Sequence, residues 1–213
     1  MISKILSIII LISVLTVFKT PDRKTIHLNY GFEVTVGKAE DFGNFETYSF
    51  FELSRNNKII YSDSTFHEYE FYDELYPLVF KTGENSYELL FEINDRPNKS
   101  YLKRLSVLND MLSKEDRFPT FISEAKDLDL DGIKEFAGFW DYSQSWDSLT
   151  VYNPIIYYEI KNDGLKIDSS LTIERNKLIY GGFHGFLYSS KEEQSIKSLE
   201  LFREEIERIE NLK

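Results

Sequence analysis

Short strand patterns separated by turn residues are the feature that most constrains the fold of this chain. From residue 25 onward, apolar and polar residues alternate over short runs, which is typical of half-buried strands. Asn56-Asn57 and Asn162-Asp163-Gly164 stand between such runs, and these residues tolerate the positive φ of tight hairpin turns. Aromatic residues, 15% of the chain, favour the same half-buried surfaces. The sequence therefore predicts a mainly β fold of antiparallel sheets, arranged as a sandwich or a partial propeller.

The second half of the chain continues the strand pattern around an acidic run at residues 127–135. Residues 118–122 lead into the acidic run. Runs of β-branched and aromatic residues predict further strands, which are 136–140, 149–152, 156–160, 165–167, 171–173 and 178–180. Residues 108–117 are polar enough for a loop or a short helix, and a boundary between two β halves is expected there. The glycine-rich residues 181–185 predict a loop.

The C-terminal segment changes to a helical pattern. Ser190 and Glu193 match a capping box, in which each side chain satisfies a helix-end donor. Apolar residues then recur at steps of three and four, and the opposite face is charged; the stripe consists of Ile196, Leu199, Phe202, Ile206 and Ile209. We expect one amphipathic helix at residues 190–213, packed on a β-rich domain at residues 25–188. A dimerising helix is the alternative.

The N-terminus has the pattern of an export signal. A short basic start, Met1-Ile-Ser-Lys4, precedes an apolar run at residues 5–18. This run is shorter than the roughly 20 apolar residues that span a membrane comfortably. Residues 1–20 are therefore expected to be a signal peptide, with an uncleaved anchor as the alternative because positive charge follows at Lys19. The protein is expected to be exported, periplasmic or extracellular, and to meet a membrane only through an uncleaved N-terminus.

The charge balance and the lack of cysteine exclude several classes of function. The formal net charge is −11, so the chain lacks the basic surface that nucleic acid requires, and no nucleic-acid partner is expected. The absence of cysteine excludes disulfides, zinc–thiolate sites and cysteine nucleophiles. The three histidines, His27, His67 and His184, show no ligand spacing, and only His184 stands in a glycine-rich context that could expose it.

The acidic run Asp127-Leu-Asp-Leu-Asp-Gly-Ile-Lys-Glu135 has the spacing of a cation-binding loop. Oxygen-bearing side chains stand at positions 1, 3, 5 and 9, glycine stands at position 6, and a main-chain oxygen is expected at position 7. The predicted metal ligands are Asp127, Asp129, Asp131, Glu135 and the carbonyl of Ile133, and the predicted cofactor is Ca²⁺. Position 12 is Gly138, so the bidentate glutamate of an EF-hand is missing. A solvated acidic turn is the alternative.

The run 127–135, followed by an aromatic strand, resembles the calcium loops of FG-GAP and VCBS-type repeats. It is also similar to the single loop of calcium-bound periplasmic lysozyme-inhibitor-like proteins of bacteria. The resemblance covers residues 118–173 and implies a β-rich, exported, calcium-stabilised domain. This chain has one copy of the loop, whereas the repeat families have several.

From these observations we expect a non-catalytic protein-binding module, with an inhibitor or immunity-type protein as one form. Trp140, Tyr142 and Trp146 follow the acidic run and could form a partner surface, since Trp and Tyr are frequent in binding hot spots. An ordinary β core is the alternative for these aromatics. The partner is an unidentified protein or glycan of the envelope or exterior. The rival functions are a cell-envelope hydrolase with unidentified catalytic carboxylates and a purely structural surface protein.

Overall fold

The computed structural model describes residues 23–43, 46–64, 68–71, 75–94, 100–140, 152–189 and 196–212. The strands of a larger sheet are β1 (Arg23–His27), β2 (Phe32–Asp41), β3 (Glu46–Arg55), β4 (Lys58–Asp63), β5 (Glu68–Glu70), β6 (Leu78–Gly83), β7 (Ser86–Asn94), β8 (Tyr101–Leu108) and β9 (Met111–Phe118). A smaller sheet and the helices comprise β10 (Glu135–Gly138), β11 (Ile156–Lys161), β12 (Gly164–Ile167), α1 (Ser169–Tyr180) and α2 (Ile196–Asn211). A 3₁₀ turn, η1 (Asn29–Gly31), joins β1 to β2.

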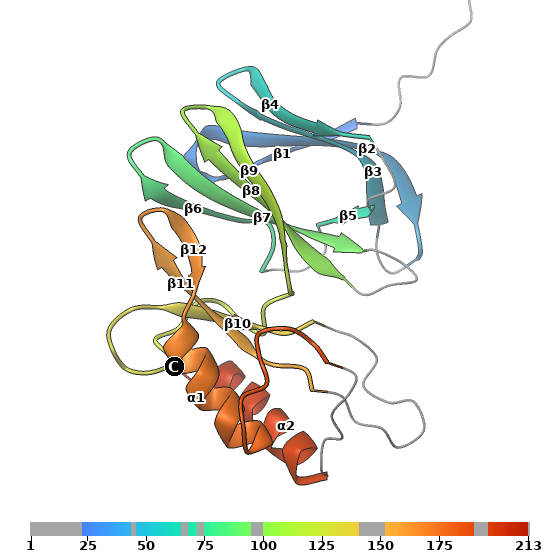
Figure 1. The fold of residues 1–213 in the computed structure, drawn as a ribbon. Helices are drawn as coiled ribbons and strands as arrows, with labels where there is room; N and C mark the ends of the chain where they lie inside the picture. Colours follow the sequence, from blue (N-terminus) through green and yellow to red (C-terminus); the bar gives the residue numbers. More distant parts are fainter. Residues whose placement is uncertain are drawn as a thin grey trace, which may run out of the picture.

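The larger sheet folds over on itself into two layers. Its strand order is β1-β2-β3-β5-β7-β8-β9, with β4 added to β3 and β6 added to β7, and all pairs are antiparallel. The short strand β5 is the only hydrogen-bonded link between the two halves within the described residues. Figure 1 shows β1–β4 lying over β6–β9, with β5 at the fold between them. The predicted mainly β, antiparallel, sandwich-like fold is therefore confirmed.

Side-chain alternation places one face of each layer in a shared core. On β7, for example, Leu89, Phe91 and Ile93 point into the sandwich and are fully buried. The rings of Phe51 and Tyr69 stack there with centroids 4.1 Å apart. The core residues from the two halves are Phe32, Val34, Val36, Tyr48, Phe51, Leu53, Tyr69, Tyr87, Leu89, Phe91, Ile93, Tyr101, Leu105 and Val107.

The strands β7 and β8 are buried on both faces, because the smaller sheet packs against their outer side. Leu90 and Leu102 point away from the sandwich and are fully buried against residues of the smaller sheet such as Phe136 and Tyr158. A strand that is covered on both faces reads as a nearly continuous apolar run, which is the pattern of residues 89–91.

The smaller sheet lies between the larger sheet and the two helices (Figure 1). Its other face, with Ala137 and Tyr157, packs on α1 and α2 through Ile179, Phe202 and Ile209. The C-terminal amphipathic helix is thus present as predicted. Phe202, Ile206 and Ile209 of its apolar stripe pack in this cluster, whereas Ile196 is exposed. None of the helices in the described ranges has the length and apolar character needed to cross a membrane.

The predicted hairpin turns are confirmed by their backbone angles. Asn56 and Asn57 have φ values of 52° and 60° between β3 and β4. Gly164, after Asn162-Asp163, has a φ of 107° and begins β12. A Cβ atom at Gly164 would lie 2.2 Å from Glu88 Oε1, so this position requires glycine both for its φ and for the close approach of β7.

Two predictions about secondary structure are wrong. Residues 171–173 and 178–180 are not strands but parts of α1, which begins after an Asp168 cap that accepts a hydrogen bond from Leu171 N and ends at Gly181 with φ 75°. Residues 108–117 are not a loop or a short helix but contain the turn and most of β9. That strand is polar because it lies at the edge of the sheet and is mostly exposed.

Candidate metal centre

The acidic run forms the loop that leads into β10. Its ends are held together by an isolated antiparallel bridge, in which Lys126 N donates to Glu135 O at 3.0 Å and Glu135 N donates to Lys126 O at 2.8 Å. The bridge brings the first and the last predicted ligands, Asp127 and Glu135, to the same end of the loop.

Hydrogen bonds inside the loop orient the aspartates. Asp129 Oδ1 accepts from Asp131 N at 3.1 Å, and Asp131 Oδ1 accepts from Ile133 N at 2.7 Å. Asp127 Oδ2 reaches across the loop and accepts from Gly132 N at 3.1 Å. Gly132 has a φ of 90°, a left-handed conformation that favours glycine. The alternation of aspartates and the central glycine therefore bend the backbone around its own carboxylates.

Three of the predicted ligands come together. Asp127, Asp129 and Glu135 each offer one carboxylate oxygen, and these oxygens lie within 4.8 Å of one another. Asp131, the fourth predicted carboxylate, is not a member of this group, and its Oδ1 is engaged with Ile133 N. The role of the Ile133 carbonyl as a ligand stays a prediction. The grouped donors are all oxygen, which suits hard divalent cations such as Ca²⁺ and Mg²⁺.

Two buried oxygens of this group have no hydrogen-bond partner among the described residues. Glu135 is only 1% exposed; its Oε2 accepts from Leu128 N at 2.8 Å, while its Oε1 is unsatisfied. Asp127 Oδ1 is likewise buried and unsatisfied. A buried polar atom without a partner destabilises the folded state by about 1–3 kcal/mol, and by more when it is charged. Both oxygens are therefore candidate ligands of a bound cation.

The electrostatics of the loop also favour a cation. Burial, followed by repulsion from Asp129, Asp131 and Asp127, raises the pKa of Glu135 to about 7, and the single backbone hydrogen bond from Leu128 only partly opposes this. Within the described part of the chain, none of the four loop carboxylates forms an ion pair with a lysine or arginine. The negative charge of the loop is therefore not balanced by a neighbouring side chain.

Two basic residues, Lys126 and Arg208, attach the loop to the C-terminal helix. Lys126 Nζ donates to the carbonyls of Ile209 and Glu210 at 2.8 and 2.7 Å, in the last turn of α2. Arg208 Nη1 donates to Leu128 O at 3.2 Å. These contacts were not predicted, because they join positions about 80 residues apart and no local pattern in the sequence encodes them.

The structure says little about the function of the other candidate residues. Trp140 is half-buried against the sandwich core, and its carbonyl accepts from Asn153 Nδ2 at 2.6 Å. Tyr142, Trp146 and His67 lie outside the described residues, as do residues 1–20 and Ser190. The ring of His184 packs edge-on against Tyr152, with centroids 5.1 Å apart.

Comparison with known proteins finds no matching family model, no matching curated protein and no matching solved structure. The resemblance to FG-GAP and VCBS-type loops therefore stays a prediction from the residues of the run 127–135.

Proposed function

We propose that the loop 127–135 binds one Ca²⁺ and that this ion stabilises the β domain. The observation that carries the proposal is the buried carboxylate of Glu135, which has an unsatisfied Oε1 and offers one oxygen to a group with Asp127 and Asp129. Ca²⁺ accepts six to eight oxygen ligands in flexible geometry, whereas Mg²⁺ requires a near-ideal octahedron. A loop built from three carboxylates and main-chain oxygens suits the less demanding ion.

The role of the ion is proposed to be structural, because the loop contributes to the packing of α2. Leu128 is buried in the same cluster as Phe202 and Ile209 of that helix. Lys126 and Arg208 connect the two segments by hydrogen bonds to main-chain carbonyls. Neutralising the loop would therefore stabilise both the entry into β10 and the C-terminal turn of α2.

Thermal unfolding of the full chain tests the calcium site. We expect Ca²⁺ at about 100 times its Kd to stabilise the protein by about 2.7 kcal/mol relative to chelator, because only the folded loop binds it. For a chain of this size the midpoint should rise by roughly 5–10 °C. Mg²⁺ at the same concentration should have a much smaller effect. If the midpoint were the same in Ca²⁺ and in chelator, the run 127–135 would be an acidic turn that binds no Ca²⁺.

We further propose that the domain is an exported, non-catalytic protein-binding module. The β3–β4 and β8–β9 hairpin tips and η1 meet at one end of the sandwich (Figure 1). The supporting observation is a set of exposed apolar side chains on these turns and the strand ends beside them. We call it the tip patch, and it consists of Tyr30, Ile59, Leu108 and Met111, which are 47–59% exposed. Exposed apolar residues grouped on rigid turns are typical of protein-interaction sites.

Arg55 connects the turns that carry the tip patch. Its guanidinium donates to Tyr30 O at 2.9 Å, to Asp110 Oδ1 at 2.8 Å and to Tyr87 OH at 2.9 Å. It also lies over the ring of Tyr87, 4.4 Å from the centroid. The backbone at the β8–β9 tip is fixed as well, since Asn109 and Asp110 both have positive φ. These contacts fix the turns that carry the patch relative to one another.

Replacing Ile59 and Met111 by aspartate should abolish partner binding and leave folding unchanged, because both side chains already face solvent. The measurement is recovery of envelope proteins on the immobilised full chain, compared with the double variant. The matched control places aspartate at two exposed apolar positions far from the tip, Leu178 and Leu187. Identical recovery by the parent chain and the Ile59→Asp/Met111→Asp variant would contradict the proposal for this patch.

A further inference from the structure

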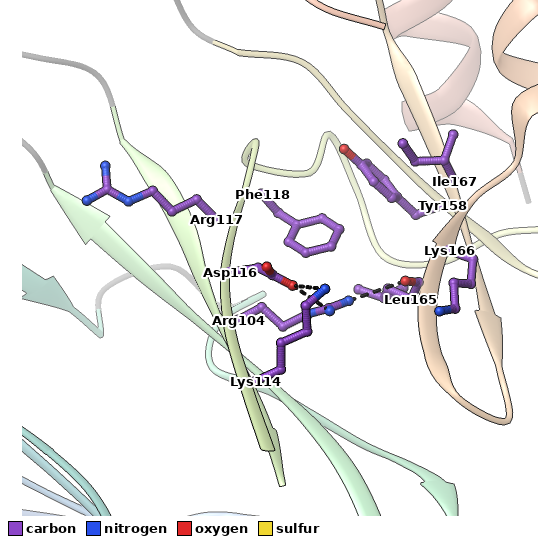
Figure 2. Close-up of a pocket in the computed structure, with 9 residues that line it drawn as sticks. All are labelled: Arg104, Lys114, Asp116, Arg117, Phe118, Tyr158, Leu165, Lys166 and Ile167. Atoms are coloured by element: carbon purple, nitrogen blue, oxygen red, sulfur yellow. Dashed lines mark hydrogen bonds and ion pairs between the residues drawn. The ribbon is translucent and has the colours of Figure 1, made fainter. Parts of the chain in front are cut away.

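A cavity of about 340 Å³ lies between the larger and the smaller sheet, at the outer face of β8 and β9 and beside the β11–β12 hairpin. Figure 2 shows side chains from both sheets around it. Its size is at the lower end of the range for small-molecule sites, and junctions between packed units are frequent positions for such sites. It is separate from the loop 127–135, none of whose residues line it.

One side of the cavity is apolar and aromatic. The rings of Phe118 and Tyr158, one from each sheet, are tilted relative to each other with centroids 4.9 Å apart. Ile167 also lines this side and is 44% exposed. An apolar ligand body would be covered by these three side chains.

The other side of the cavity carries cations. Arg104 is 6% exposed, and its guanidinium lies over the Phe118 ring, 4.9 Å from the centroid. Lys114 Nζ approaches Asp116 Oδ2 at 2.8 Å, and Lys166 stands on the opposite rim with a half-exposed side chain. Arg117 also contributes to the wall, but Figure 2 shows its side chain pointing away from the cavity.

The hydrogen bonds of Arg104 leave part of its guanidinium unsatisfied. Nη2 donates to Asp116 Oδ2 at 2.6 Å, and Nη1 donates to Leu165 O at 3.3 Å. Nε is buried and forms no hydrogen bond within the described residues; the Glu88 carboxylate approaches it only to 3.5 Å. Glu88 does not line the cavity, so Nε is directed toward a residue outside it. Arg104 would therefore act on an anionic ligand through its positive charge and its Nη atoms.

The charges around the cavity favour a monoanion. Three cations, Arg104, Lys114 and Lys166, and one carboxylate, Asp116, point toward the cavity. Asp116 is bonded to Arg104 and Lys114 on the same wall. Two further acids lie behind the cations, but Asp163, which pairs with Lys166, is largely exposed and screened by water. Glu88 pairs with Arg104 at 3.5 Å, and burial raises the pKa of its carboxyl above the ordinary value. The positive surplus is small, so it suits a single carboxylate better than a dianion.

We propose that this cavity binds a small organic acid, with its carboxylate among Arg104, Lys114 and Lys166 and its apolar body against Phe118, Tyr158 and Ile167. The ligand would bridge the two sheets, since each of its ends contacts side chains from both: the carboxylate contacts Lys114 and Lys166, and the apolar body contacts Phe118 and Tyr158. This inference does not depend on the calcium site or on the tip patch.

The test is a titration of the isotope-labelled full chain with benzoate, followed by amide chemical shifts. We expect saturable shifts at residues 104, 118, 158 and 165–167 in the millimolar range. The neutral isostere benzamide and inorganic phosphate should each bind at least about tenfold more weakly, a difference of about 1.4 kcal/mol. Benzamide lacks the charge, and phosphate lacks the apolar body.

Charge variants identify the cations that are responsible. In the Lys114→Gln/Lys166→Gln variant, the Kd for benzoate should rise about tenfold. The control variant, Lys58→Gln/Lys161→Gln, removes the same charge from exposed positions outside the cavity. Its Kd for benzoate should stay within about twofold of the parent value. All four lysines are surface residues, so both variants should retain the parent amide spectrum. Equal benzoate affinity in the two double variants, equal affinity for benzamide, or shifts confined to other residues would overturn the proposal.

Discussion

The order of stability of the parent chain and the Glu135→Gln variant is expected to reverse between chelator and Ca²⁺. In chelator the variant should be at least as stable as the parent chain, because glutamine removes a buried charge that faces the other loop carboxylates. In Ca²⁺ the parent should gain about 2.7 kcal/mol and the variant almost nothing, because a charged ligand is lost. The measurement is urea unfolding of both proteins under both conditions.

Glu88→Gln is the control for this experiment. Glu88 is also a buried glutamate, 3% exposed, but it lies on β7 and accepts from Ser106 Oγ at 2.9 Å, away from the loop. Its replacement should change stability equally in Ca²⁺ and in chelator. If Glu135→Gln kept the full calcium increment, Glu135 would not be a ligand. If it were strongly destabilised in chelator, its carboxylate would serve the fold without a metal.

Loss of Glu205 is expected to have the second large effect. This residue of α2 is 5% exposed and accepts from Tyr157 OH at 2.5 Å and from Arg208 Nη2 at 2.8 Å, and it also pairs with Arg175 of α1. Burial alone would raise its pKa, but the hydrogen bonds from the two arginines outweigh burial and hold the pKa below its ordinary value. Glu205→Gln removes this charge and leaves two arginines partly buried without it.

The expected cost is about 3 kcal/mol, at the lower end for a broken buried ion pair because the arginines retain some contact with water. The midpoint of thermal unfolding should fall by roughly 6–12 °C. Glu204→Gln is the matched control: the neighbouring residue is exposed, and its replacement should change stability by less than about 0.5 kcal/mol. A similar loss in the two variants would show that helix charge, and not the buried network, is responsible.

Local sequence patterns predicted the elements whose geometry is decided locally. The positive φ values of Asn56 and Asn57 follow from residue type, and so does the turn before Gly164. The helix α1 was missed because its short apolar groups look like strands, although Asp168 and Gly181 are an ordinary helix cap and stop. The strand β9 was missed because an exposed edge strand lacks the apolar pattern that identifies buried ones.

The candidate metal centre, too, was predicted only where local sequence decides the geometry. The spacing of the acidic run predicted the grouping of Asp127, Asp129 and Glu135, but not that Asp131 would be excluded from the group. The attachment of the loop to α2 and the cavity around Arg104 depend on contacts between distant segments. Arg104 is a case in point, since nothing in residues 101–108 indicates that its side chain would lie under a hairpin formed 60 residues later.

The bond between Lys126 and the last turn of α2 has a consequence for biosynthesis. The loop leaves the ribosome about 80 residues before the helical turn that holds it. Until Ile209 and Glu210 emerge, the Lys126 ammonium lacks these acceptors. A nascent or prematurely terminated chain would therefore lack the contact that fixes the end of the loop beside Asp127.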